Sequence, residues 1–126
     1  MPNQAVNTSA APAAIGPYSQ GIHAGNTVYV SGQLPIDPAT GAFPGEDIIS
    51  QTRQSLQNVQ AILAEAGMAM TDVVKTTVLL SDITDFAAMN EVYATFFSAP
   101  YPARAAFQVA ALPKGAKVEI EVVAVK

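Results

Sequence analysis

The last segment of the chain, Lys117-Val-Glu-Ile-Glu-Val-Val-Ala-Val125, alternates between two kinds of side chain and is rich in β-branched residues. This pattern predicts a β-strand whose successive side chains point to opposite faces. One face is apolar and consists of Val118, Ile120 and Val122. The other face consists of Glu119, Glu121, Val123 and Val125. Two carboxylates beside two valines suit neither plain solvent surface nor plain core, so we interpret this second face as a subunit interface that contains a polar pocket.

Two helices precede this strand. From Asp47 onward, apolar and small residues recur at helical spacing, at Thr52, Leu56, Val59, Leu63 and Ala66. Asp47 suits the N-cap of this helix, and Gly67 suits the position that follows its last turn. A second helix is predicted from Asp85, with an apolar face made of Phe86, Met89, Tyr93 and Phe96 or Phe97. Residues 98–102 (SAPYP) end it, because proline cannot continue a helix.

Four further strands are predicted, at residues 19–23, 27–31, 73–80 and 103–109. The first two flank a turn signal, Ala24-Gly25-Asn26, and form a hairpin. With the two helices the order is β-β-α-β-α-β-β, which predicts an α+β fold with one mixed sheet and both helices packed on one face. We expect residues 1–126 to form a single domain, with residues 1–10 irregular or mobile.

The simplest pairing of the last two strands is a hairpin about Pro113-Lys114-Gly115. That pairing places Arg104 opposite Ala124, five residues or roughly 16 Å along the strand from Glu119. If Arg104 and Glu119 serve one small ligand, two explanations remain. Either the strands are not hairpin partners, or a bend or a neighbouring subunit brings the two side chains together.

The composition of this 126-residue chain removes most of the usual catalytic equipment. It has no cysteine, which excludes a disulfide framework, a thiolate zinc site and a cysteine nucleophile. Its one histidine, His23, is interpreted as surface or structural, and a multi-histidine metal site within one chain is excluded. Six scattered Lys and Arg residues against ten Asp and Glu give a net charge of −4, which argues against a nucleic-acid surface. No apolar run suits a transmembrane helix or a signal peptide, so we expect a soluble cytoplasmic protein without a membrane partner.

Arg104 and Glu119 are the leading candidates for chemistry. Arg104 stands in a long uncharged stretch, where it either extends from a strand end into solvent or binds a carboxylate through two parallel hydrogen bonds. Glu119 and Glu121 are ~7 Å apart on one strand face, a spacing that fits paired acid–base carboxylates or an ordinary amphipathic strand. Tyr18 suits a pocket at a strand edge, and in Ser31-Gly32 the glycine lets a ligand approach the backbone.

Five blocks of the sequence, in order from about Ala10 to the C-terminus, resemble the RidA (YjgF-type) family of enamine/imine deaminases. They are Ile15-Gly-Pro-Tyr-Ser-Gln-Gly21, Val30-Ser-Gly-Gln33, Val74-Lys-Thr-Thr-Val78, Pro102-Ala-Arg104 followed by Leu112, and Val118-Glu-Ile120. The resemblance implies a chorismate-mutase-like fold and a homotrimer whose three sheets face inward as a barrel, with active sites in the clefts between subunits. It implies hydrolysis of 2-aminoacrylate, 2-iminopropanoate and 2-iminobutanoate to 2-oxo acids and ammonia, without a metal or other cofactor.

The resemblance also assigns roles to residues. By position, Arg104 would bind the substrate carboxylate and Glu119 would hold and polarise the attacking water. The cleft would be lined by Tyr18, Ser31, Gly32 and Asn90, and by the backbone of Ala106. The chain departs from the family in two places, since Ala106 occupies a position that is often cysteine, and residues 98–101 form a shorter segment than in many members.

Two other functions are weighed beside the deaminase. The first is a non-catalytic regulatory trimer that binds small 2-oxo acids through Arg104. It would need the arginine but not the water-holding carboxylate of Glu119, so the presence of both favours the enzyme. The second is a ribonuclease or translation inhibitor, as some family members are described, and the acidic sequence pI of about 4.6 disfavours it.

Overall fold

A computed structural model describes residues 3–126. Six strands are present in this range: β1 (Gln4–Val6), β2 (Gly21–Ala24), β3 (Thr27–Gln33), β4 (Val73–Leu80), β5 (Ala103–Gln108) and β6 (Val118–Val125). The two α-helices are α1 (Ile48–Glu65) and α2 (Phe86–Ala94). Three single turns of 3-10 helix complete the list: η1 (Met70–Asp72), η2 (Ile83–Asp85) and η3 (Pro113–Gly115).

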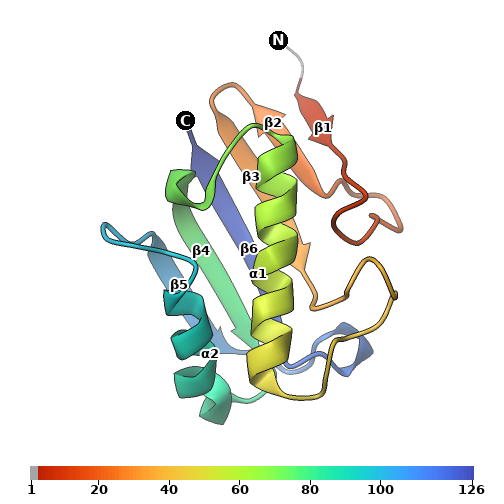
Figure 1. Ribbon diagram of the computed structural model, residues 1–126, viewed down its shortest axis with the longest axis vertical. Coiled ribbons are helices and arrows are strands. Elements are labelled where there is room, and N and C mark those ends of the chain that lie inside the picture. The colour runs from red at the N-terminus through yellow and green to blue at the C-terminus, as the bar shows by residue number, and fades with distance from the viewer. Residues whose placement is uncertain (1–2) are drawn as a thin grey trace.

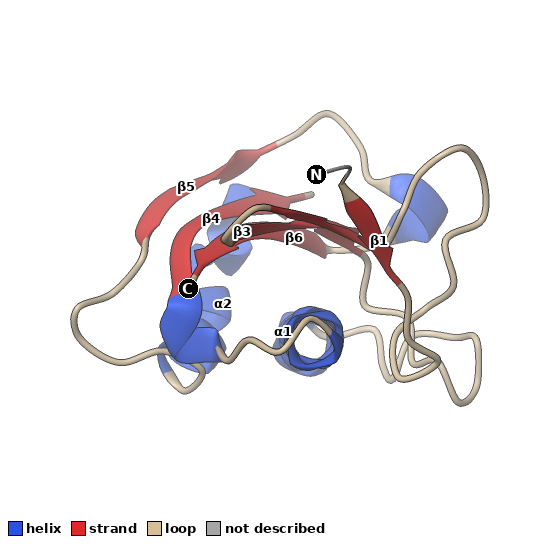
Figure 2. Cartoon of the chain, turned by 90° about the horizontal axis from the view of Figure 1, so that it is seen from above, coloured by secondary structure: helices blue, strands red, loops and turns tan. Residues whose placement is uncertain are grey.

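All six strands form one mixed sheet in the order β1-β2-β3-β6-β4-β5 (Figure 1). The β4–β5 pair is parallel and the other neighbours are antiparallel. Both α1 and α2 lie on the same side of the sheet, as the view from above shows (Figure 2). The predicted α+β class, with two helices on one face of a mixed sheet, is therefore confirmed.

The core lies between α1 and the middle strands. On β6 the predicted apolar face is buried, with Val118, Ile120 and Val122 at most 3% exposed. The opposing residues of α1 are equally inaccessible: Leu56, Val59, Ile62 and Leu63. The predicted ends of α1 are also confirmed, because the Asp47 carboxylate accepts a hydrogen bond from the Ser50 amide (2.9 Å) and Gly67 adopts a positive φ of 78° after the last turn.

The last two strands do not form the hairpin that is their simplest pairing. Strand β6 lies between β3 and β4, whereas β5 is the edge strand beyond β4. The reason is the connection through α2, since two strands joined by a crossover helix pair in parallel. Arg104 consequently lies opposite Thr76, not opposite Ala124. The last two strands are therefore not hairpin partners, but this strand order does not by itself bring Arg104 to Glu119.

The expectation that residues 1–10 are irregular is wrong for Gln4–Val6, and the part of it that concerns residues 1–2 lies outside the described residues. Strand β1 pairs with β2, with Gln4 opposite His23, and Val6 is buried. The segment has little strand propensity of its own. The unpaired backbone groups along the edge of β2 offer it hydrogen bonds that sequence patterning does not show.

Buried amides on α1 hold the proline-rich segment between β3 and α1. The Asn58 side chain donates to the carbonyls of Leu34 (3.1 Å) and Ile36 (2.9 Å). Gln51 donates to the Gly45 carbonyl and accepts a hydrogen bond from the Lys117 amide (2.9 Å), which ties the start of β6 to the same helix. Two amides thus replace the regular secondary structure that this segment lacks.

We predict that Asn58→Ala destabilises the protein by about 2 kcal/mol, because two partly buried carbonyls lose their donor. Urea unfolding followed by circular dichroism measures this as a lower midpoint at unchanged slope. Gln57→Ala is the matched control, since Gln57 is a neighbouring exposed residue of α1. Equal midpoints for the two variants would show that these hydrogen bonds do not stabilise the fold.

Candidate active site

Arg104 lies on β5 and reaches across to α2. Its Nη1 donates a hydrogen bond to Oδ1 of Asn90 (2.6 Å). The guanidinium carbon stands 4.7 Å from the ring centroid of Tyr93 and 5.4 Å from that of Phe86. Both rings are neutral, as is the Asn90 amide, so these contacts hold the cation without neutralising its charge. The guanidinium N–H groups not bonded to Asn90 can bind a carboxylate in the bidentate manner.

Arg104 borders a cavity of about 460 Å³. The residues that line it come from α2 and from the segment leading into β5: Asn90, Tyr93, Ala94, Tyr101, Pro102 and Arg104. Ala106 lies two residues further along β5, beside Val78 of β4, and packs partly on the core. Three of the predicted site residues, Arg104, Asn90 and Ala106, are therefore brought together by the β4–α2–β5 unit.

The other predicted residues form a second group at the ends of β3 and β6. The Glu119 carboxylate lies directly against Gly32, and a Cβ atom at Gly32 would overlap with it. A larger residue at position 32 would force the Glu119 carboxylate to move from this place. The Ser31 hydroxyl donates to the Ser19 carbonyl (2.5 Å), which ties the end of β3 to the segment bearing Tyr18. Tyr18 and Gly32 line a cavity of about 300 Å³, whose walls also include Ile15 and Lys114.

Glu119 is half-buried, and burial raises the pKa of its carboxyl above the ordinary value. The neighbouring charge of Glu121 raises that pKa further, because both carboxylates lie on the same strand face. A raised pKa makes Glu119 a better proton acceptor than a fully solvated glutamate, while Glu121 is exposed. The two glutamates thus differ in environment although they are only two residues apart.

The two groups lie on opposite faces of the sheet. Arg104 is level with Thr76 and, one strand further, with Val122, both buried under the helices. Glu119 is level with Leu79 on β4, and it belongs to the face of β6 that the helices leave uncovered. Three residues along the sheet and two strand spacings across it separate their backbones by roughly 14 Å.

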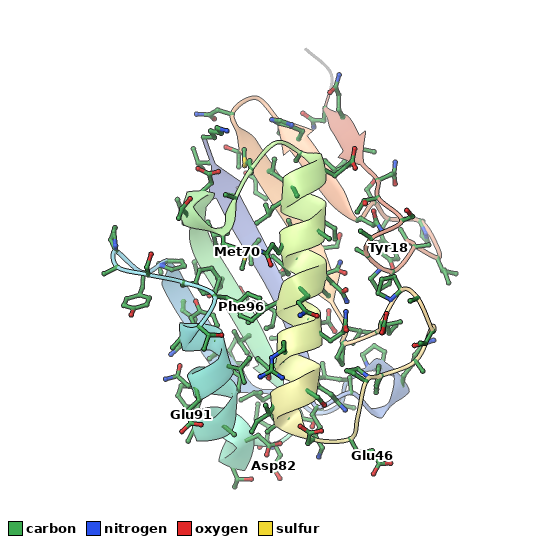
Figure 3. The ribbon with its side chains drawn as sticks, in the orientation of Figure 1. Tyr18, Glu46, Met70, Asp82, Glu91 and Phe96 are labelled. Carbon is green, nitrogen blue, oxygen red and sulfur yellow. The ribbon has the colours of Figure 1, made fainter. Side chains whose placement is uncertain are left out.

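The side-chain view agrees with this separation. Tyr18 lies on the opposite side of α1 from α2, the helix that carries Glu91 (Figure 3). Arg104 is hydrogen-bonded to Asn90 of α2, whereas Glu119 lies against Gly32, which lines one cavity together with Tyr18. One chain therefore presents two half-sites: a cation with neutral partners, and a carboxylate with a raised pKa beside a cavity.

Comparison with known proteins relates the whole chain to one family. The sequence profile described as "Endoribonuclease L-PSP" matches residues 8–126. The chain is 58% identical to RutC family protein y4sK of Sinorhizobium fredii, covering 94% of each chain. It is 53% identical to the 2-iminobutanoate/2-iminopropanoate deaminase of Capra hircus, covering 96% of this chain and 88% of that protein.

Comparison with solved structures indicates the same family. The crystal structure of RidA from the Antarctic bacterium Psychrobacter has a TM-score of 0.94 and 51% identity, and covers 98% of this chain and 99% of its own. The crystal structure of E. coli TdcF with bound serine has the same TM-score at 48% identity, and covers 98% of each chain. The chain belongs to the RidA (YjgF-type) family.

Membership of the RidA family was predictable from the five sequence blocks, but one feature of the site was not. Tyr93 was expected to be a core residue, and it is indeed only 5% exposed. Its ring nevertheless touches the guanidinium of Arg104. The available signal was the helical spacing of Phe86, Asn90 and Tyr93, which places all three on one face of α2.

Residues 3–126 of this RidA-family chain contain neither a cluster of potential metal ligands nor a helix suited to span a membrane. No group of three or more His, Cys, Asp or Glu side chains in this range is arranged to hold a metal ion. Nor does the described part of the chain include a helix with the length and apolar character needed to cross a lipid bilayer.

We predict that Glu121→Gln lowers the pKa of Glu119 but leaves it above the ordinary glutamate value. The substitution removes the repulsion between two like charges and does not change burial, which is the larger cause of the shift. The measurement is a titration of the carboxyl carbons by NMR. Glu91→Gln, an exposed substitution on α2, is the control. A Glu119 pKa that is the same in Glu121→Gln and in the unmodified protein would contradict the prediction.

Proposed function

We propose that this protein hydrolyses reactive 2-imino acids and their enamine tautomers, such as 2-aminoacrylate/2-iminopropanoate and 2-iminobutanoate, to 2-oxo acids and ammonia. The observation that carries the proposal is the pair of half-sites: Arg104, held by neutral partners, and Glu119, a half-buried carboxylate with a raised pKa. They supply the two things that imine hydrolysis needs, a carboxylate anchor and a proton acceptor for water. The names of close relatives support the same reaction.

We further propose that the working site forms between subunits of a homotrimer, whose sheets face inward as a barrel. Within one chain, Arg104 and Glu119 are too far apart, and on different faces of the sheet, to touch one three-carbon substrate. The uncovered face of the sheet also carries large apolar side chains, since Tyr29 is 53% and Phe107 is 47% exposed. A neighbouring subunit would cover that face and bring its Glu119 to Arg104.

Binding begins at the substrate carboxylate. Two N–H groups of the Arg104 guanidinium donate to the two carboxylate oxygens, and Asn90 keeps one nitrogen of the guanidinium in place. Tyr18, Ser31 and Gly32 would line the side of the cleft where water enters, and the Ala106 backbone would line the arginine side. An enamine substrate first takes a proton at its terminal carbon and becomes the iminium form.

Hydrolysis then needs one oriented water. Its oxygen bonds to C2 of the iminium, the π electrons of the C=N bond move to nitrogen, and Glu119 takes a proton from the water. The proton returns to nitrogen, the C–N bond breaks as the C=O bond forms, and ammonia leaves while the hydroxyl proton passes to solvent. Because an iminium carbon is already electrophilic, positioning and one proton acceptor are sufficient. Glu119 must be ionised, so activity falls as the pH drops through its raised pKa.

The regulatory and ribonuclease functions make different demands on the same residues. A regulator that senses 2-oxo acids would bind them through Arg104 and would gain nothing from a carboxylate with a raised pKa. A ribonuclease would need a basic surface, but the chain has only six Lys and Arg residues against ten Asp and Glu. The deaminase uses both half-sites, which is why we prefer it.

The test is a coupled assay in which a serine dehydratase generates 2-aminoacrylate and release of the 2-oxo acid is followed. We predict that the protein accelerates release. Glu119→Gln is expected to lose about 10²-fold or more in kcat while still binding a 2-oxo acid, because only proton transfer is removed. Glu121→Gln, the matched control on the same strand face, is expected to change kcat by less than about threefold.

Each failure of this assay has a meaning. Binding of 2-oxo acid without any acceleration would replace the deaminase by the regulator. Equal losses in Glu119→Gln and Glu121→Gln would remove the water-handling role from Glu119.

The site between subunits is tested by mixing two impaired variants. We predict that Arg104→Ala and Glu119→Gln each have greatly reduced activity alone, and that unfolding and refolding them together in equal amounts gives activity well above that of either variant. When a site takes its arginine and its glutamate from different subunits, about one quarter of the sites in random trimers have both residues intact. Sedimentation equilibrium confirms the oligomer in each sample. Trimers without recovered activity would place both groups of each site on one chain.

A further inference from the structure

A buried hydrogen bond lies directly beneath Arg104. It joins the hydroxyl of Thr76 on β4 to the hydroxyl of Tyr93 on α2, at 2.8 Å. Thr76 is fully buried and Tyr93 nearly so. Such a bond between two buried hydroxyls fixes the direction of both side chains. A buried hydroxyl without a partner would lose its hydrogen bonds to water and gain none within the protein.

The same tyrosine touches the arginine. The guanidinium carbon of Arg104 lies 4.7 Å from the centre of the Tyr93 ring, closer than to Phe86. The Asn90 hydrogen bond fixes one nitrogen of the guanidinium but leaves the group free to rotate about that contact. A ring face removes this rotation, because the planar cation lies favourably along it. The plane of Arg104 therefore depends on the orientation of Tyr93.

The register of the sheet makes the arrangement a closed loop of contacts. Thr76 is the backbone partner of Arg104 in the β4–β5 pair. Tyr93 connects the two side chains of this pair from above, through a hydrogen bond to one and a ring contact to the other. A second ring, that of Phe97, packs against Tyr93 at 4.6 Å. The tyrosine is thus held at its hydroxyl and along its ring.

We propose that Tyr93 is a positioning residue, which Thr76 holds in place and which sets the plane of the Arg104 guanidinium for bidentate binding of the substrate carboxylate. The inference rests on the proposed function of Arg104 as the carboxylate anchor. It adds that the affinity of this anchor depends on the buried hydrogen bond between the Thr76 and Tyr93 hydroxyls. An arginine whose guanidinium is already held in one orientation loses less side-chain entropy on binding than a mobile arginine does.

The test measures binding and turnover separately, using 2-oxobutanoate as a stable ligand in calorimetry and the coupled imine assay for rates. Tyr93→Leu removes the ring face and is expected to raise Kd and KM about fivefold, the scale of a cation–π contact at an exposed site, with a smaller change in kcat. Tyr93→Phe keeps the ring but loses the hydroxyl hydrogen bond. Its Kd and KM are expected to lie between those of Tyr93→Leu and those of the unmodified protein. Thr76→Val breaks the same bond, so the Tyr93→Phe/Thr76→Val pair is expected to bind no more weakly than Thr76→Val alone.

Two controls separate positioning from general loss of stability. Val92→Ala makes a cavity at another buried residue of α2, and is expected to lower the Tm while leaving Kd unchanged. In an Arg104→Gln background there is no cation to orient, so adding Tyr93→Leu is expected to change Kd by less than about twofold.

The outcomes distinguish the two proposals. A Kd for Tyr93→Leu within about twofold of the unmodified protein would overturn the positioning role, as would a Tyr93→Leu effect that persists in full with Arg104→Gln. If no imine is hydrolysed but Kd still follows the order given for the Tyr93 variants, the deaminase proposal fails and the positioning role stands.

Discussion

Side chains on β6 alternate strictly between a buried face and an uncovered one, and the rest of the molecule depends on this alternation. The inner residues pack under α1 and form the floor of the core, while the outer ones include Glu119 and Glu121. Because the strand lies in the middle of the sheet, its inner face cannot move without disturbing the core. Glu119 is consequently held on a rigid element, beside a glycine that leaves room for its carboxylate.

Arg104, unlike Glu119, is positioned by side chains of a helix and not by a place in the middle of the sheet. It lies on an edge strand, where backbone pairing constrains it on one side only, and its position is set by side chains of α2. All of these partners are neutral, so the cation keeps its charge for a ligand. A carboxylate in the place of Asn90 would have satisfied the guanidinium internally and removed the anchor. The proposed site would thus combine a carboxylate on a rigid strand with a cation that its own partners do not neutralise.

Several features could be predicted from residue patterns because they depend on interactions between residues close together in the sequence. The ends of α1 follow from the capping preferences of Asp47 and Gly67, and the two faces of β6 follow from strand alternation. Strand β1 could not be read in this way, because it owes its structure to the edge of β2. Nor could the second role of Tyr93, since a tyrosine on an apolar helical face has the same pattern whether or not a cation lies above its ring.

The sequence by itself determined the α+β class, the ends of α1 and, through five short blocks, the family, and it supplied the candidate residues of the two half-sites, whereas α2 ends at Ala94, before the predicted Phe96 or Phe97. Only the tertiary structure decided how those residues are distributed in space. The β4–α2–β5 crossover moves Arg104 to the edge of the sheet, and β6 inserts between β3 and β4. Strand order is a property of long-range backbone pairing, and alternation along a single strand carries no information about its neighbour. For that reason the sequence predicted both Arg104 and Glu119, but not that one chain holds them on opposite faces.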